Sequence, residues 1–434
     1  MKKLLWILLL TQGILMSATL TQLEINQTKV PLIFEENSNL PIVSMQLVFK
    51  NSGSLSDTKD GLVKLSAKLL NEGTLKDGSV GFATKLENRA ISLSAHAGAE
   101  TFVIELSSLK SEFNYGLELL EQLLVDPNYS EATLEKIKTQ TLGTLKRKES
   151  DFDYISNLTL KGMLFPNTPL AKPSLGTIKS VKSMGLDDIK GHIDTHLGLE
   201  NLIVVMGGDL NQSQAQKMVL DVLKKLPHVA PKVIPLMEPH SKEEIKTTKV
   251  ESKQAYIYFG APLAVRYNSE DRYKARVASF ILGSSGFGSR LMEEIRVKQG
   301  LAYSAYSRFR INRTNSYFWG YLQTKVRSGN EAVARVKEVV KEFIEKGVTQ
   351  EELTAAKQFL LGSEPLRNET LSQRLNRAFS EYYNQRPLGA SLQDLEKISA
   401  LSLEDLNQFI QSHKEIGQLS FSVVTGEEES NVTK

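Results

Sequence analysis

Two histidines stand four residues apart in the segment LDDIKGHIDTH. On a helix, His192 and His196 share one face, and two imidazoles at this spacing can hold a zinc ion. Asp188 precedes His192 by one helical turn and could add a carboxylate ligand. The alternative is a structural pair without a metal. A related segment in the second half of the chain favours that alternative, because it has Phe409 where the first has His192.

Arg296 and Tyr303 are a second candidate, in the segment Ser289–Ser304 (SRLMEEIRVKQGLAYS). The pattern predicts a helix, a break at Gly300 and then a strand. A turn between the two would bring the guanidinium and the phenol together. Both groups are donors suited to a carbonyl or a developing oxyanion. From the residues alone, a solvated arginine and a half-buried sheet tyrosine are the simpler interpretation.

Other patterns mainly exclude classes of site. The glycine-rich segment 283–289 (GSSGFGS) lacks both a following Lys-Ser/Thr and the G-x-G-x-x-G order, so a flexible loop between two helices is predicted instead of a nucleotide site. His96 stands alone in a strand-like segment and is interpreted as structural. The chain has no cysteine, which excludes disulfides, thiol catalysis and thiolate metal sites.

The stretch Gly61–Thr74, GLVKLSAKLLNEGT, predicts a buried helix. Its leucines recur at helical spacing, and Gly73 is placed to end the helix. Lys64 and Lys68 share one face, where two ammonium groups repel each other.

Two segments of the first half recur in the second half. Ser130–Gly143 matches Thr349–Gly362, and the helix that begins at Leu186 matches the one that begins at Leu403 at nearly the same offset. This predicts duplication of a unit of about 210 residues. Each unit mixes alternating strands with long helices. We therefore expect an α+β fold of two homologous domains, each an antiparallel-type sheet packed with helices.

The predicted organisation has four parts: a signal peptide over 1–18, an N-terminal peptidase-like domain over 19–226, a linker over 227–241 and a C-terminal homologous domain over 242–434. The first part has two lysines, an apolar run and a small-residue cleavage site, which predicts export to a periplasm-like space; an uncleaved N-terminal membrane anchor is the alternative. The linker has a proline at every fourth residue, which favours an extended chain.

The balance of charge and the hydropathy of the chain exclude some classes of binding partner. The chain has 53 Lys and Arg against 50 Asp and Glu, and the two signs are interspersed. This balance gives no electrostatic footprint for nucleic acid or an acidic membrane surface. Beyond the signal segment no apolar run is long enough to span a membrane, so no stable span is expected after its removal.

These features together resemble the insulinase/pitrilysin metallopeptidase family, and most of all its two-domain branch that includes the mitochondrial processing peptidase. The resemblance covers essentially the whole mature chain. It rests on the duplication, the helix Gly61–Thr74, the segment LGTIKS at Leu175–Ser180 and the Ser-Arg-Leu start at Ser289. The loop 283–289 also resembles, in shortened form, the glycine-rich loop of that peptidase's non-zinc subunit.

The family's zinc helix carries an inverted H-x-x-E-H, with two histidine ligands, a glutamate base and a further glutamate ligand downstream. The resemblance places Lys64, Ala67 and Lys68 at the three helix positions. A protonated lysine has no lone pair for zinc, and alanine cannot take a proton. Glu135 is the nearest acid to the downstream position. We expect this chain to bind no metal.

Arg296 and Tyr303 match the family's arginine and its tyrosine seven residues on, which hold substrate and stabilise the tetrahedral intermediate. The resemblance therefore implies a zinc-less subunit of an exported heteromeric metallopeptidase. Its homologous partner subunit would bear the zinc, and peptides or unfolded protein segments would be the substrates. An inert structural or binding homologue is the alternative, and an independent hydrolase with a site at His192 and His196 is a third.

Overall fold

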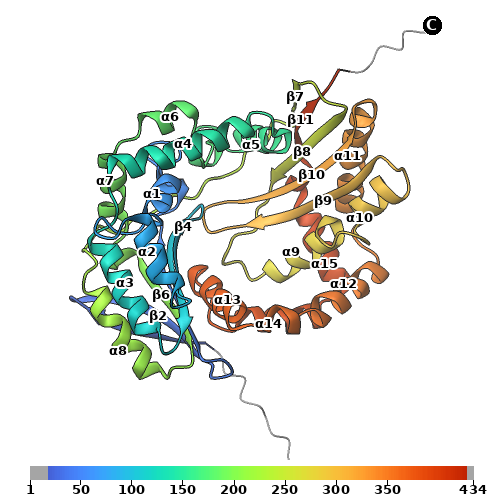
Figure 1. Cartoon of the computed structure of the whole chain (residues 1–434). Coiled ribbons are helices and arrows are strands. Elements are labelled where there is room, and N and C mark those ends of the chain that lie inside the picture. The colour runs from blue at the N-terminus through green and yellow to red at the C-terminus, as the bar shows by residue number, and fades with distance from the viewer. Residues whose placement is uncertain (1–17, 428–434) are drawn as a thin grey trace, which may run out of the picture.

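The computed structural model describes residues 18–427 (Figure 1). The predicted signal peptide, apart from its last residue, lies outside the described residues. The first half contains β1 (Thr19–Ile25), β2 (Thr28–Glu36), β3 (Ile42–Lys50), α1 (Leu62–Leu70), α2 (Gly78–Glu87), β4 (Ser92–Ala97), β5 (Thr101–Leu109), α3 (Phe113–Val125), α4 (Glu131–Lys148), α5 (Phe152–Leu164), α6 (Ile178–Ser183), α7 (Leu186–His196), β6 (Leu202–Gly208) and α8 (Gln212–Leu223).

The second half repeats this order with fewer strands at its start. It contains β7 (Ile245–Lys249), β8 (Gln254–Pro262), α9 (Arg272–Ser279), α10 (Arg290–Met292), β9 (Ala302–Ile311), β10 (Ser316–Lys325), α11 (Gly329–Lys346), α12 (Gln350–Gly362), α13 (Leu371–Tyr383), α14 (Ala390–Ala400), α15 (Leu403–Ser412) and β11 (Ser420–Thr425). Two π-helical turns, Phe280–Ser284 and Glu293–Val297, follow α9 and α10.

The two sheets share one topology. Their strand orders are β1-β2-β6-β3-β5-β4 and β7-β11-β8-β10-β9, so β6, β3, β5 and β4 correspond to β11, β8, β10 and β9. Neighbours are antiparallel except for one parallel pair in each sheet, β2 with β6 and β7 with β11. The α+β class with two homologous units is confirmed. The parallel pairs were not predicted, because alternation reports burial of one face and not the direction of the next strand.

Each sheet is covered on one face by helices of its own half and on the other by a helix of the opposite half (Figure 1). From the first half, α5 packs Leu160 and Leu164 against Tyr258 and Trp319 of the second sheet. In return, α13 packs Leu375 and neighbouring residues against the β2 and β6 face of the first sheet. The halves are therefore interlocked by an exchange of corresponding helices.

The connection between the halves is extended. Residues 224–244, which include all four regularly spaced prolines, form neither helix nor strand. Across residues 18–427, no helix is both long enough and apolar enough to cross a membrane.

Candidate functional site

Helix α1 is shorter than the helix predicted from the sequence, because side chains fix both of its ends. At its start, the Asp57 carboxylate accepts hydrogen bonds from the backbone N–H groups of Val63 (2.7 Å) and Gly61 (3.1 Å). Burial raises the pKa of Asp57 to about 6, although these two bonds act in the opposite direction. After its last residue, the Asn71 side chain pairs in both directions with the backbone of Ala95 in β4, at 2.7 and 2.8 Å.

The two lysines of α1 tie it to neighbouring elements. The Lys64 ammonium donates to the carbonyl oxygen of Ala97 in β4, and Lys68 donates to Thr141 Oγ1 of α4 at 2.9 Å. Burial lowers the pKa of both lysines; the charge of Lys64 lowers that of Lys68 further. Ala67, between them, is buried in the core of the first half. The lysines thus tie α1 to β4 and α4.

These residues do not fit a zinc ion. Two ammonium groups and a methyl group offer it no lone pair. Glu135, the acid nearest to the downstream ligand position, lies on the exposed side of α4 and pairs with Lys138 at 2.6 Å. Thr141 is the α4 residue that meets Lys68. Among residues 18–427, no group of three or more His, Cys, Asp or Glu side chains is placed to hold a metal.

His192 and His196 are brought together, but as a packed pair. Both are buried, and their rings stack with centroids 4.1 Å apart and planes at 21°. His196 Nδ1 is 3.0 Å from the carbonyl oxygen of His192. Asp188 is directed away from them, to Lys59 at 2.6 Å. Burial, and then the neighbouring His196, lowers the pKa of His192 to about 3, so the ring is neutral at pH 7.

The second half repeats this arrangement without a second imidazole. At the end of α15, the rings of Phe409 and His413 lie 4.2 Å apart, and His413 Nδ1 is 2.8 Å from the carbonyl oxygen of Phe409. A phenyl ring can replace the first histidine because the shared requirement is a flat ring against the second one. The motif is therefore a feature of helix packing in both halves.

Arg296 and Tyr303 are in contact. Arg296 lies on the π-helical turn after α10, and its guanidinium carbon is 4.5 Å from the ring centroid of Tyr303, near the start of β9. The same carbon lies 4.7 Å from the ring centroid of Phe287. The guanidinium thus contacts two aromatic rings. Phe287 was missed from the sequence, although an aromatic residue between two glycines in a loop was an available signal.

The Arg296 guanidinium is positioned by aromatic contacts, and its hydrogen-bond donors have no partner among residues 18–427. Tyr303 and Phe287 are 81% and 71% exposed. In the described part of the chain, the Arg296 guanidinium makes no hydrogen bond or ion pair, so its N–H groups are available to a ligand. Gly286 and Gly288 flank the phenylalanine with φ of 73° and 85°, which glycine adopts without strain. The loop thereby presents an aromatic side chain at its tip.

The two candidate centres lie far apart in the fold. Figure 1 shows α1 with the first sheet and α10 on the opposite side of the molecule, beyond the second sheet. Arg296 and Tyr303 therefore do not reach the Lys64 region of their own chain.

Comparisons with known proteins agree with this fold. Residues 32–178 match the model described as Insulinase (Peptidase family M16), and residues 183–360 match the one described as Peptidase M16 inactive domain. The sequence named Non-peptidase homolog YmxG from Helicobacter pylori (strain ATCC 700392 / 26695) is 47% identical, over 98% of this chain and 99% of that protein. The Mitochondrial-processing peptidase subunit beta of Blastocladiella emersonii is 20% identical over 74% of this chain and 70% of its own length.

A crystal structure of a peptidase M16 inactive domain from Pseudomonas fluorescens superposes with a TM-score of 0.87 at 23% identity. The match covers 94% of this chain and 98% of that one. At this identity the likeness shows the fold, which includes both halves. The chain belongs to the insulinase family of peptidases, peptidase family M16.

Proposed function

We propose that this chain is the zinc-less subunit of an exported heteromeric M16 peptidase and supplies Arg296 and Tyr303 to the active site of a homologous zinc-bearing subunit. One observation carries the proposal: a half-buried arginine that contacts two exposed aromatic rings and has no hydrogen-bond partner among residues 18–427, on a chain whose Lys64, Ala67 and Lys68 offer zinc no ligand. A surface side chain held in this way is suited to a ligand that comes from outside the chain.

The two side chains suit peptide chemistry. The guanidinium offers several N–H donors in a fixed plane, and the phenol offers an O–H. Both can bind a peptide carbonyl and then stabilise the charge that develops on its oxygen when zinc-bound hydroxide attacks. Stacking on Phe287 and Tyr303 limits the motion of the guanidinium, which lowers the entropic cost of binding. The zinc and the general base would come from the partner subunit.

The proposal also covers the substrates, the cellular location and the domain organisation. Peptides and unfolded segments are the expected substrates, and the segment Met1–Ala18 is expected to direct export to the periplasm before its removal. The four-part division predicted from the sequence, with homologous domains over 19–226 and 242–434, is retained as part of the proposal. The Helicobacter pylori relative's name, which calls that protein a non-peptidase homolog, supports a chain that has no peptidase activity of its own.

Co-expression tests the proposal. The mature chain should be produced with a zinc-bearing M16 homologue from the same genome, and peptide hydrolysis measured with and without a zinc chelator. Loss of one oxyanion donor typically costs about 100-fold in kcat. We expect losses of that order from Arg296→Ala and smaller ones from Tyr303→Phe, with the complex intact. Arg327→Ala, at an exposed arginine elsewhere in the second half, is the matched control.

A second candidate is a purely structural or binding homologue. The relative's printed name favours it as much as the first, because a non-peptidase homolog need not assist a peptidase. In that case the complex would form, and hydrolysis would be the same with wild-type chain, Arg296→Ala and Tyr303→Phe. This result would end the proposed catalytic role.

A further inference from the structure

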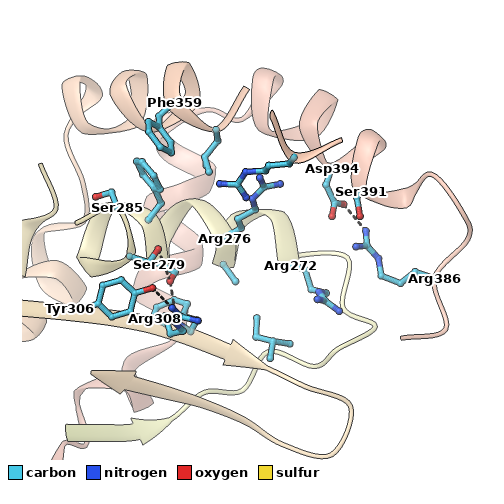
Figure 2. A pocket seen from close by; sticks show the side chains of 17 residues that line it. Arg272, Arg276, Ser279, Ser285, Tyr306, Arg308, Phe359, Arg386, Ser391 and Asp394 are labelled. Carbon is cyan, nitrogen blue, oxygen red and sulfur yellow. Dashed lines mark hydrogen bonds and ion pairs between the residues drawn. The ribbon is translucent and has the colours of Figure 1, made fainter. Parts of the chain in front are cut away.

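A cavity of about 600 Å³ lies in the second half, outside the Arg296 site (Figure 2). It is open to solvent and is lined by α9 and the π-helical turn after it, the edge strand β9, α12, the first turns of α14, and the connecting segments that carry Arg367 and Arg386. Five of its lining residues are arginines, and one is an acid: Arg272, Arg276, Arg308, Arg367, Arg386 and Asp394. This volume is within the usual range of ligand sites. The excess of positive charge in the lining is unusual, and we therefore examined which groups neutralise it.

Only part of this positive charge is neutralised by the chain itself. Arg386 forms an ion pair with Asp394 at 2.7 Å. Arg276 approaches Glu364 only to 3.8 Å, and that carboxylate is shared with the closer Arg377 at 2.7 Å. One carboxylate therefore serves two guanidinium groups.

The other three arginines of the cavity have no acidic partner among the described residues. Arg272 donates to the backbone carbonyl of Tyr267, and Arg308 donates to the hydroxyl of Tyr306. The Arg367 guanidinium makes neither a hydrogen bond nor an ion pair within residues 18–427. Neutral oxygens satisfy donors but leave the charge uncompensated.

Electrostatics of the two α9 arginines support this account. Burial lowers the pKa of Arg272, and the nearby Arg386 lowers it further, while Asp394 acts in the opposite direction. Burial likewise lowers the pKa of Arg276, with Arg367 as the next cause. Like charges thus face one another in a partly dry space, where their repulsion is stronger than in water. An anion in the cavity would relieve both effects.

The arrangement favours several separate anionic groups over one compact anion. Figure 2 shows Arg308 and Tyr306 at one end of the cavity and Arg386 with Asp394 at the other, with the two α9 arginines between them. Guanidinium groups that converge on a single phosphate would instead point to one place. A chain that carries carboxylates at intervals matches a spread of this kind.

The cavity also adjoins the candidate peptide site along β9. Tyr306, in the cavity wall, is three residues from Tyr303, which is about 10 Å at the rise of a strand. We propose that the cavity binds the carboxylate side chains of an acidic peptide segment whose neighbouring residues lie at Arg296 and Tyr303. This inference rests on the proposed function for the peptide itself. What it adds is a preference for substrates with Asp or Glu on one side of the bound bond.

Binding to the full mature chain tests the preference directly. The probes are two fluorescein-labelled ten-residue peptides, one with glutamates at alternate positions and one with glutamines there. Fluorescence anisotropy at low salt should show the glutamate peptide bound at least tenfold more tightly, and 0.5 M NaCl should remove most of the difference. Equal affinity of the two peptides for the wild-type chain would overturn the proposal before any variant is made.

Paired variants then locate the effect. Arg276→Gln with Arg367→Gln should weaken the glutamate peptide at least tenfold and leave the glutamine peptide unchanged. Arg147→Gln with Arg327→Gln removes the same charge from exposed positions outside the cavity and should change neither peptide. Equal losses in the two pairs would reduce the effect to net charge and overturn the site. Arg276→Lys with Arg367→Lys keeps the charge if the glutamine pair does not fold, and should retain most of the preference.

Two further outcomes separate this inference from its alternatives. Displacement of the glutamate peptide by inorganic phosphate at concentrations below the peptide's own Kd would identify a free-anion site and overturn the peptide assignment. Arg296→Ala should weaken both peptides alike. If Arg296→Ala leaves hydrolysis by the complex unchanged while the cavity variant still loses the glutamate preference, the proposed function fails and the acidic site stands.

Discussion

His192→Phe should make the protein more tolerant of acid. The buried ring of His192 has a pKa of about 3 in the folded chain, against an ordinary value of 6.5. The unfolded chain therefore binds a proton at this residue more readily than the folded chain does. The stability that the neutral ring contributes is complete above pH 6.5 and is lost as pH falls from there toward 3. Phenylalanine takes up no proton, so this loss disappears in the variant.

The size of the effect follows from the two pKa values. Between them, each pH unit costs about 1.4 kcal/mol of the free energy of unfolding. From pH 7 to pH 5 the wild-type chain should therefore lose about 2 kcal/mol through this residue alone. That is a substantial part of the roughly 5–15 kcal/mol that typically separates folded from unfolded protein.

The second half of the chain supplies both the design and its control. Phe409 already packs against His413, with almost the same ring separation as the histidine pair and a tilt of 38° in place of 21°, and the phenyl ring introduced by His192→Phe would pack against His196 in a similar way. The reciprocal change, Phe409→His, should add a buried imidazole and steepen the loss of stability in acid. Urea denaturation of the three proteins at pH 7, 6 and 5 measures both slopes. Any packing cost of the larger ring is common to all pH values and cancels in the slope.

Two results would refute this reasoning. A wild-type slope retained by His192→Phe would mean that the residue is protonated as easily when folded as when unfolded. A loss of folding at pH 7 in His192→Phe, with Phe409→His well folded, would mean that the two stacks are not equivalent, and the packing interpretation of the histidine pair would fall with it.

Three other changes have definite expected outcomes. Arg374→Ala leaves the buried Glu35 carboxylate without its 2.6 Å partner from the other half of the chain. Urea titrations should show a free energy of unfolding lower by about 3 kcal/mol. Changing both residues to Met should cost less, because no unpaired charge is then left buried. Phe287→Ala should leave stability within about 0.5 kcal/mol of wild type and weaken peptide binding several-fold, since it removes one of the two faces that hold Arg296. Elemental analysis should find no zinc in the triple variant Lys64→His/Ala67→Glu/Lys68→His. Adding Thr141→Glu, which supplies a carboxylate ligand from α4, should give stoichiometric zinc. Zinc in the triple variant alone would contradict the assignment of Thr141 to the position of the third ligand.

The sequence predicted the elements whose signals are local. The helix that begins at Leu186 lies where it was predicted, over Leu186–His196, since helical spacing needs only one buried face. Helix α5 was not predicted as a distinct element, and its role could not have been. Its buried face, with Leu160 and Leu164, packs on strands about a hundred residues further along the chain. Nothing in a local pattern says which sheet an apolar face will meet.

The candidate site divides in the same way. The contact between Arg296 and Tyr303 could be predicted, because a turn joins the two short elements that carry them. That Lys64 and Lys68 offer zinc no lone pair follows from residue type alone. The partners of these residues could not, since Thr141 and Ala97 come from elements whose approach depends on the tertiary fold. The arginine-lined cavity could not be predicted from the sequence for the same reason. Its five arginines lie at separate positions between residues 272 and 386.

The exchange of α5 and α13 also bears on which chain the arginine can serve. A hinge between the halves could in principle bring Arg296 toward α1. Each half, however, covers one face of the other's sheet, and Ser156 of α5 donates a 2.9 Å hydrogen bond to the carbonyl oxygen of Ser422 in β11 of the second sheet. Closure would have to expose both apolar faces, at about 25 cal/mol for each Å² uncovered. A second chain that meets the exposed rings of Phe287 and Tyr303 needs no such rearrangement, and this is the stronger physical reason to look for the zinc on a partner.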